Sequence, residues 1–250
     1  MLQFSKSTAF LHRYWKAIRS YFKWAPEEFE IPRPDTKLPM PAYTIKEVKP
    51  ITKGEIVKLL NACEEIEVDP EDRDPYTFRR PTRFRDKGLI LVLLDTGVRI
   101  GEFTRLNVGD LRLEAGQLEV RPHHIRKTTP RTTIIGKSAQ RALWSYLSKR
   151  DWREPEDPLF MTYNDWRMDV GAVRSLLRRL GERAGVDNVH AHRFRHTCAI
   201  EYLRNGGDIF TLQSILGHKS LKMVRHYLSI ATNDVATAHR RASPVDGWRL

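Results

Sequence analysis

In the N-terminal part of the chain, residues 7 to 25, apolar positions recur with a period close to that of an α-helix. One face of this helix would collect the apolar side chains, which are Phe10, Leu11, Tyr14, Trp15, Ile18, Tyr21 and Phe22. The charged positions of the same segment are all basic. A single helix this apolar is not stable alone in water. We therefore expect it to pack on the main domain, pair with another molecule, or represent the last helix of a larger domain.

A proline-rich segment follows, with six prolines between positions 26 and 50. Proline lacks a backbone N–H and holds φ fixed, so this spacing favours an extended linker over residues 26 to 50. After the linker, Thr52 and Glu55 have the three-residue spacing of a capping box. They predict a helix through about Ala62 and the beginning of the main domain at residue 51.

The main domain is predicted to be mainly helical. An apolar run at 84–94 indicates a buried helix that ends at Thr96-Gly97, and Arg99 begins another helix. Period-two segments near 117–121 and 131–135 predict a hairpin. Further helices are expected over 137–149, 169–185, 192–205, 208–216 and 220–230. The predicted fold class is therefore α+β, mainly α with a small antiparallel sheet over residues 51–230, followed by a C-terminal helix and tail at 231–250.

The charge of the chain points to a kind of partner. Lys and Arg number 43 against 31 Asp and Glu, which gives a formal net charge of +12. Each cation that neutralises a phosphate releases a counterion, so this balance favours nucleic acid, although an ordinary basic surface has the same composition. No apolar run reaches the roughly 20 residues that span a bilayer, and no secretory signal is recognisable. Cys63 and Cys198 suggest neither a disulfide framework nor a metal site, so we expect a cytoplasmic protein without membrane contact.

Four local motifs carry chemically active residues. TGVRIGE places Arg99 at the start of a helix after a glycine break, and RKTTPR at 126–131 lies at the tip of the predicted hairpin. In HRFRHT, His192 and Arg195 are three residues apart and therefore share one helical face. In LGHKSLKMVRHY, a histidine follows a glycine and precedes a tyrosine by nine residues; these are His218 and Tyr227.

Each motif alone has a simpler explanation. Arg99 taken singly fits a surface salt bridge, and Tyr227 fits a packing aromatic. His192 and His196 have the i,i+4 spacing of a metal pair, but no third ligand is evident, so a zinc site is not favoured. Gly217-His218 fits the boundary between two helices.

Together, the order of the four motifs resembles the active site of the tyrosine recombinases, the phage integrase and Xer-like family. The resemblance covers roughly residues 50 to 250 and rests on TGVRIGEFTRLNVGDL, HAHRFRHTCAIEYLRNGGD and LQSILGHKSLKMVRHYL. Family members usually carry an N-terminal helical core-binding domain; residues 1–25 resemble only its last helix, and 26–50 resemble the interdomain linker. We therefore expect a truncated core-binding domain. In relatives the C-terminal helix packs into a neighbouring protomer, and 231–250 either does so or folds back on its own domain.

The resemblance implies a tyrosine-type DNA strand transferase that acts without metal, ATP or another cofactor. Arg99 and Arg195 would stabilise the charge of the transition state, because guanidinium groups are permanently charged and offer paired donors. Tyr227 would be the nucleophile that forms a 3′-phosphotyrosyl link, with His192 as general base and His218 hydrogen-bonded to the scissile phosphate. A hairpin residue would protonate the leaving 5′-oxygen. Lys127 is favoured because an amine releases a proton more readily than a guanidinium, but a one-residue change in the turn places Arg126 there instead.

The expected partner is double-stranded DNA, bound by a homo-tetramer, and the expected location is the cytoplasm in association with the nucleoid. Further basic residues fit a DNA-facing surface or, taken singly, a solvated one: Arg79, Arg80, Arg83, Arg85, Arg126, Arg174 and Arg178. The implied function is site-specific recombination, as in an integrase, a transposon resolvase or a chromosome-dimer resolvase. Two alternatives remain: relaxation of DNA by type IB topoisomerase chemistry, and a DNA-binding regulator derived from an integrase that is non-catalytic or weakly active.

Overall fold

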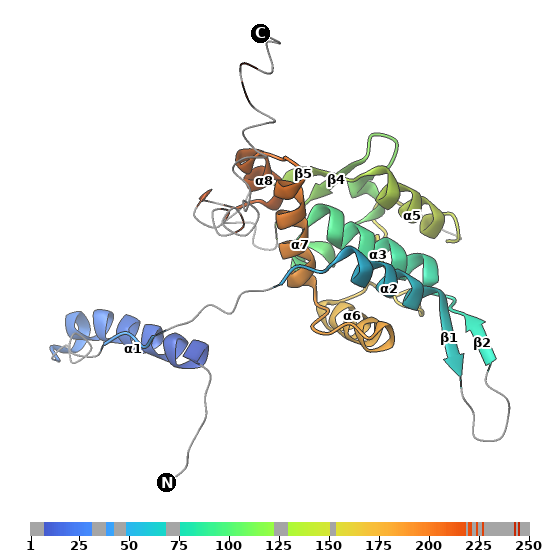
Figure 1. Ribbon diagram of the computed structural model, residues 1–250. Coiled ribbons are helices and arrows are strands. Elements are labelled where there is room, and N and C mark those ends of the chain that lie inside the picture. Colours follow the sequence, from blue (N-terminus) through green and yellow to red (C-terminus); the bar gives the residue numbers. More distant parts are fainter. Residues whose placement is uncertain are drawn as a thin grey trace. The chain divides into compact units, whose positions relative to one another are not determined.

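The computed structural model describes residues 8–31, 39–42, 49–68, 76–122, 130–150, 154–218, 220–221, 224, 227, 243 and 245 (Figure 1). The chain divides into two compact units, Met1–Val48 and Lys49–Leu250. Among the described residues, no helix combines the length and the apolar character needed to cross a bilayer.

The first unit contains α1, Thr8–Phe29. Its apolar face is about half exposed, for example at Leu11, Tyr14 and Ile18. The helix continues past Ala25, where we predicted its end, because Pro26 falls in the last turn. There the missing N–H costs a single backbone hydrogen bond and the helix stops three residues later.

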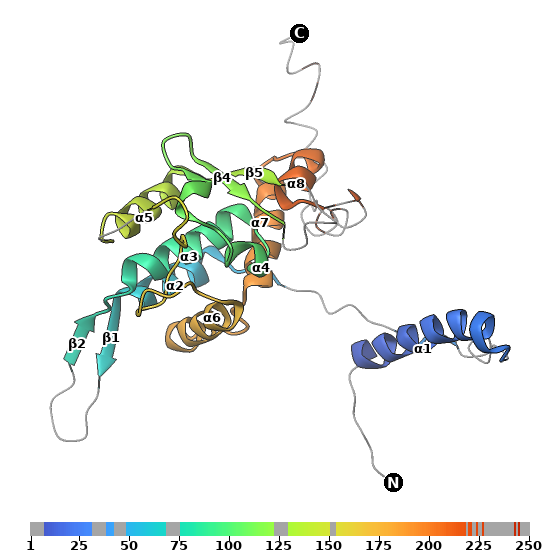
Figure 2. The ribbon, with the colours of Figure 1, turned by 180° about the vertical axis from the view of Figure 1, so that it is seen from behind.

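The second unit is mainly helical with two small antiparallel sheets, which confirms the predicted fold class (Figures 1 and 2). Its elements are α2 (Lys53–Glu64), β1 (Glu65–Val68), β2 (Tyr76–Arg79), α3 (Arg83–Thr96), α4 (Ile100–Phe103), a 3-10 turn (Val108–Asp110), β3 (Leu111–Arg112), β4 (Gln117–Val120), β5 (Arg131–Ile134), α5 (Lys137–Leu147), α6 (Val170–Ala184), α7 (Ala191–Arg204) and α8 (Ile209–Leu216). The predicted helices from 137 to 216 are present as α5 to α8, with ends within two residues of those expected.

Local sequence signals account for several element boundaries. The Thr52 hydroxyl accepts from the Glu55 N–H and the Glu55 carboxylate accepts from the Thr52 N–H, so the predicted capping box begins α2. The predicted hairpin is formed by β4 and β5, with Gln117 opposite Ile134 and Val120 opposite Arg131.

The hairpin of β1 and β2 was not predicted, and it extends away from the helices in both views (Figures 1 and 2). Its strands are four residues each and one of them alternates Glu with Ile and Val. A pattern this short does not separate strand from loop without knowledge of its partner.

The core is centred on α3, which packs against α2, α5 and α7. Leu89, Ile90, Val92 and Leu93 are fully buried, as expected for the apolar run. A second, smaller cluster joins α7 to α8 and the chain beyond them; its buried members are Ala199, Ile200, Leu212, Leu216, Val224 and Tyr227. Of the predicted helix over 220–230, the described positions 221, 224 and 227 are helical.

Two arginines that we predicted to face DNA are instead largely buried and pair with a buried carboxylate. Arg80 and Arg85 approach opposite oxygens of Asp86, at 2.9 Å and 2.7 Å. The Asp86 carboxylate is fully buried, and both arginine side chains are only 11% exposed. A buried carboxylate needs such partners, because its desolvation is costly without them. We therefore no longer expect Arg80 or Arg85 to contact phosphate.

Replacing Asp86 with Ala is expected to lower the free energy of unfolding by about 3–5 kcal/mol, because it leaves two guanidinium groups buried without their carboxylate. Urea denaturation measures this change. Glu182→Ala is the matched control, since Glu182 pairs with Arg178 on the surface at 2.8 Å; its effect is expected to stay below about 1 kcal/mol. Similar losses for the two variants would contradict the structural role of Asp86.

Candidate active site

The glycine break after α3 brings the segments of the site together. Gly97 has φ +56°, and a Cβ added to it would lie 2.8 Å from the Leu216 side chain and 3.1 Å from Cys198 Sγ. Only glycine satisfies both the left-handed backbone and this close approach. The end of α3 is thereby held against α7 and α8, and Arg99 follows at the N-cap of α4.

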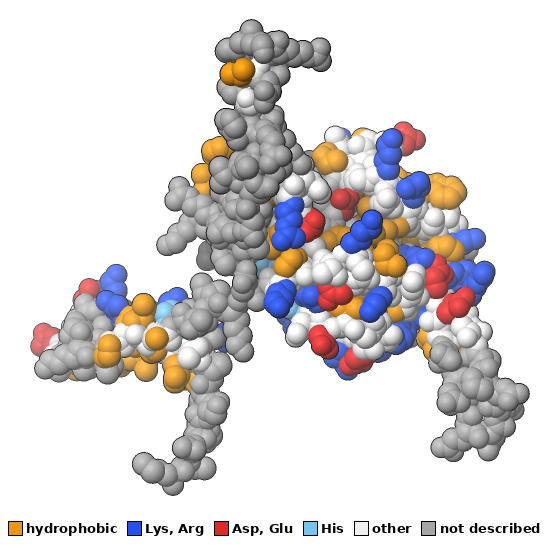
Figure 3. Space-filling model, viewed as in Figure 1, with side chains coloured by type: hydrophobic (Ala, Val, Ile, Leu, Met, Phe, Trp, Pro, Cys, Tyr) orange, Lys and Arg blue, Asp and Glu red, His pale blue; other side chains and the backbone are white. Residues whose placement is uncertain are grey.

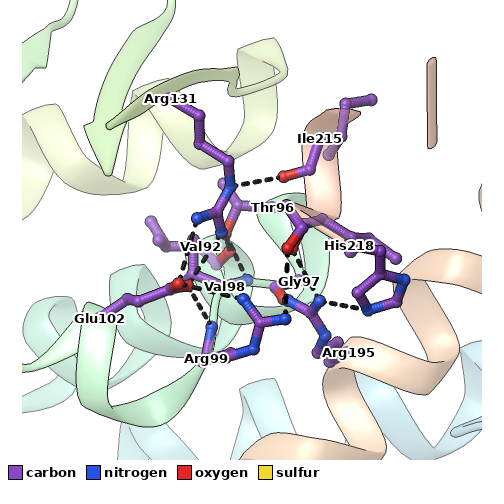
Figure 4. A network of polar contacts seen from close by, with 12 residues as sticks. Val92, Thr96, Gly97, Val98, Arg99, Glu102, Arg131, Arg195, Ile215 and His218 are labelled. Atoms are coloured by element: carbon purple, nitrogen blue, oxygen red, sulfur yellow. Dashed lines mark hydrogen bonds and ion pairs between the residues drawn. The ribbon is translucent and has the colours of Figure 1, made fainter. Parts of the chain in front are cut away.

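Arg195, on α7, is the most enclosed cation of the site, with 3% of its surface exposed. Its Nη1 donates to Gly97 O at 2.6 Å, and its Nη2 donates to Leu216 O at 2.7 Å and lies 2.6 Å from His218 Nε2 (Figure 4). Burial, with the positive charge of Arg99, lowers the pKa of Arg195 to about 10, so the group remains charged at neutral pH. None of the ion pairs among the described residues joins it to a carboxylate. A buried cation in this state favours a bound anion.

Arg99 lies beside it with its side chain 41% exposed. Its backbone N–H and its Nη1 donate to the two oxygens of Glu102, at 3.0 Å and 3.2 Å, and its Nη2 donates to Gly217 O at 3.4 Å. The guanidinium therefore bridges the start of α4 and the turn after α8 while part of it faces the outside.

The Glu102 carboxylate has a second partner that the sequence analysis did not single out. Arg131 on β5 donates Nη1 to Oε1 at 3.1 Å and Nη2 to Oε2 at 2.9 Å (Figure 4). Burial alone would raise the pKa of Glu102, but the hydrogen bonds and charges of Arg131 and Arg99 outweigh it and leave the pKa below its ordinary value. Glu102 is therefore ionised at neutral pH.

His218 is held in a turn after α8. Gly217 has φ +62°, and the His218 N–H donates to Gln213 O at 3.0 Å, while Gln213 Nε2 donates to His218 O at 3.0 Å. Burial and the charges of Arg195 and Arg99 lower the pKa of His218 to about 4. The neutral ring can accept from Arg195 through Nε2, and its buried Nδ1 has no hydrogen-bond partner among the described residues. Nδ1 is then a donor that an incoming anion could use.

Tyr227 is 5% exposed and lies between two histidine rings. The ring of His196 meets it edge-on with centroids 5.1 Å apart, and the ring of His218 is stacked on it at 6.2 Å. Burial raises the pKa of Tyr227 above its ordinary value. Arg195 opposes this shift through its charge and through a hydrogen bond to the phenol, and Arg99 opposes it through its charge. The phenol is therefore protonated at neutral pH.

His192 lies one helical turn before His196, with their Nε2 atoms 3.0 Å apart. Two ring nitrogens at this distance share one hydrogen, so one of them is unprotonated. Partial burial and the charge of Arg195 lower the pKa of His192, which keeps it neutral near pH 7. The i,i+4 spacing in HRFRHT therefore brings His192 against His196, and the ring of His196 in turn contacts the ring of Tyr227. No group of three possible metal ligands occurs in the described part of the chain.

The structure thus gathers five of the six predicted catalytic residues, which are Arg99, His192, Arg195, His218 and Tyr227. Lys127 and Arg126 lie outside the described residues.

Arg174 and Arg178 are exposed on α6, and Arg178 pairs with Glu182. Arg79 is exposed on β2, whereas Arg83 is partly covered and contacts Glu64 at 3.8 Å. In Figure 3, basic and acidic side chains are interspersed over the visible face of the second unit.

Comparison with known proteins identifies the family. The model of the Phage integrase family matches residues 49–234. The chain is 29% identical over 226 residues to tyrosine recombinase XerA of Saccharolobus solfataricus, covering 90% of this chain and 65% of that protein. It is 30% identical over 161 residues to tyrosine recombinase XerC of Corynebacterium efficiens, covering 64% of this chain and 51% of that protein. The chain thus spans between half and two thirds of the length of these relatives.

Solved structures share the fold. The crystal structure of XerA recombinase matches with a TM-score of 0.61 at 26% identity, over 92% of this chain and 74% of that one. The Tn1549 transposon integrase in complex with a circular intermediate DNA matches with a TM-score of 0.75 at 19% identity, over 95% and 80%. The family match covers nearly all of the second unit, and the order of the four motifs agrees with it. The chain therefore belongs to the Phage integrase family of tyrosine recombinases.

Proposed function

We propose that this chain cleaves and rejoins duplex DNA through a covalent link between Tyr227 and a 3′-phosphate, without metal or ATP, and so carries out site-specific recombination. The observation that carries the proposal is the enclosed Arg195, a cation bonded to carbonyls and to His218, beside a buried tyrosine. A phosphodiester supplies the negative charge that this arrangement favours.

The scissile phosphate would be bound by Arg99, Arg195 and His218. The two guanidiniums share the charge that develops on the non-bridging oxygens, and His218 adds a hydrogen bond from its neutral ring. Donors held in place in this way contribute most in the transition state, because no reorganisation is needed when charge develops.

The reaction breaks the bond between phosphorus and the 5′-oxygen while the Tyr227 oxygen bonds to phosphorus. The phenol proton leaves to His192, whose lowered pKa keeps it able to accept one at neutral pH. The charges of Arg195 and Arg99 lower the cost of forming the phenolate, since both oppose the effect of burial on the pKa of Tyr227. The leaving 5′-oxygen takes a proton from Lys127 or Arg126. Because the phosphotyrosyl link keeps the energy of the broken bond, attack by another 5′-hydroxyl reverses the steps without a cofactor.

The proposed partner is duplex DNA bound by a homo-tetramer. Three of the similar proteins are described in DNA complexes: the Tn1549 transposon integrase with a circular intermediate DNA, XerH bound to its difH substrate after cleavage, and a dimer of lambda integrase bound to a core site. On this chain we propose that the exposed Arg174 and Arg178 contact phosphates on either side of the cleaved bond, with Arg79 and Arg83 as further contacts. Such contacts position the protein without reading sequence.

A nicked duplex tests the proposal, built on the site that the protein selects from a random-sequence pool. The nick lets the short 5′-hydroxyl strand diffuse away, so a covalent adduct accumulates and is seen on a denaturing gel. We expect wild type to form the adduct, Tyr227→Phe to form none, and Tyr163→Phe, at a tyrosine 75% exposed, to behave as wild type. DNA binding without an adduct would favour the alternative of a DNA-binding regulator derived from an integrase. Plasmid relaxation without strand exchange would favour topoisomerase chemistry.

A further inference from the structure

Two arginines share the buried Glu102 carboxylate unequally. Arg131 contacts both oxygens through two nitrogens and its side chain is 11% exposed. Arg99 reaches one oxygen through Nη1 at 3.2 Å and its side chain is 41% exposed. The planar fork of Arg131 therefore neutralises the carboxylate, and the guanidinium of Arg99 is only partly engaged.

We propose that Arg131 is a positioning residue that takes up the charge of Glu102, so that Arg99 keeps its own charge for the phosphate. The inference rests on the proposed function, because it assigns a purpose to Arg99 in binding an anion. With Arg131 present, three guanidiniums and one carboxylate leave two positive charges in the cluster. Without it, the buried carboxylate has Arg99 as its remaining ion-pair partner and draws that guanidinium away from the phosphate.

Arg131 also contacts the turn that carries His218. Its Nε donates to Ile215 O at 2.9 Å, and a Cβ added to Gly217 would lie 3.1 Å from its Cζ. Glycine at 217 therefore suits the left-handed backbone and also leaves room for the arginine lying against it. One side chain from β5 therefore holds Glu102 and the residues directly before His218 (Figure 4). β5 is also the strand that follows the hairpin segment with Lys127 and Arg126.

A purely structural role would have different consequences from a charge-balancing role. If Arg131 only joins β5 to its neighbours, removing Glu102 as well adds a second loss. If Arg131 neutralises Glu102, removing the carboxylate charge restores the charge of Arg99. The decisive comparison is therefore Arg131→Gln against Arg131→Gln combined with Glu102→Gln.

Inorganic phosphate serves as the probe, titrated into the full chain at constant ionic strength and followed by calorimetry. Arg99→Gln defines the part of the binding that belongs to the site. We expect Arg131→Gln to weaken that part about tenfold, and the double variant to return within about threefold of wild type. Arg131→Lys keeps the charge and is expected to stay within about threefold as well. Circular dichroism melting curves confirm that each variant is folded. If Arg131→Gln is not folded, Arg131→Lys takes its place in the test.

Three results would overturn the inference: phosphate binding that does not depend on Arg99, an Arg131→Gln variant that binds as wild type, or a double variant as weak as Arg131→Gln. If Arg131→Gln does not fold, an Arg131→Lys affinity as low as that of Arg99→Gln would also overturn it. The assay contains no DNA and does not use Tyr227. Its outcome is therefore separate from the adduct test: absence of an adduct with the expected phosphate pattern would reject the proposed catalysis and leave the charge balance supported.

Discussion

Replacing Arg195 with Gln is expected to slow formation of the Tyr227 adduct by about 10²–10³-fold, the range seen when a fixed donor to a developing negative charge is removed. Arg195 donates to Gly97 and Leu216 and lies 2.6 Å from His218, so it places both itself and the imidazole. Arg195→Lys is expected to recover only part of the rate, because an ammonium group cannot reproduce the planar fork.

Arg195→Gln is expected to alter the free energy of unfolding by less than about 1 kcal/mol, because the weakening of its hydrogen bonds to the Gly97 and Leu216 carbonyls is offset by removal of a buried charge. Single-turnover cleavage and urea denaturation measure the two effects. Arg204→Gln is the matched control on α7, since Arg204 is exposed and pairs with Glu201; neither quantity should change. A cleavage rate of Arg195→Gln within about tenfold of the wild-type rate would show that Arg195 does not stabilise the transition state.

Stability should fall as the pH is lowered from about 6.5 to about 4, because of His218. The ordinary histidine pKa of 6.5 applies to the unfolded chain, whereas burial and the charges of Arg195 and Arg99 lower the pKa of His218 to about 4 in the folded protein. Between these values the unfolded chain binds a proton that the folded protein does not. Protons therefore favour unfolding, and the difference amounts to about 3 kcal/mol.

Urea denaturation at pH 7.5, 6.5, 5.5 and 4.5 measures this dependence in wild type and in His218→Gln. Both proteins lose the stability that comes from carboxylates such as Glu102, whose pKa is also lowered. The difference between them isolates His218, and wild type is expected to lose about 2–3 kcal/mol more by pH 4.5. Parallel curves for the two proteins would show that His218 titrates as an ordinary histidine.

Features that depend on neighbouring residues could be predicted from the amino-acid sequence alone. The capping box of Thr52 and Glu55 begins α2 because both hydrogen bonds are local. The apolar run at 84–94 became the buried α3 because a helix without a polar face must be enclosed. The order and spacing of Arg99, the His192–Arg195 pair and the histidine nine residues before Tyr227 were also enough to identify the family.

The partners of each charged side chain, in contrast, depend on the tertiary structure. Arg80 and Arg85 have the same local character as exposed arginines, yet they pair with buried Asp86. Arg131 meets Glu102 across 29 positions of sequence, and Arg195 meets Gly97 across 98. A guanidinium takes the nearest acceptor in space, and the desolvation that makes the pairing matter depends on packing from distant segments. Sequence spacing therefore predicted which residues come together at the candidate site, whereas the balance of their charges depends on the fold.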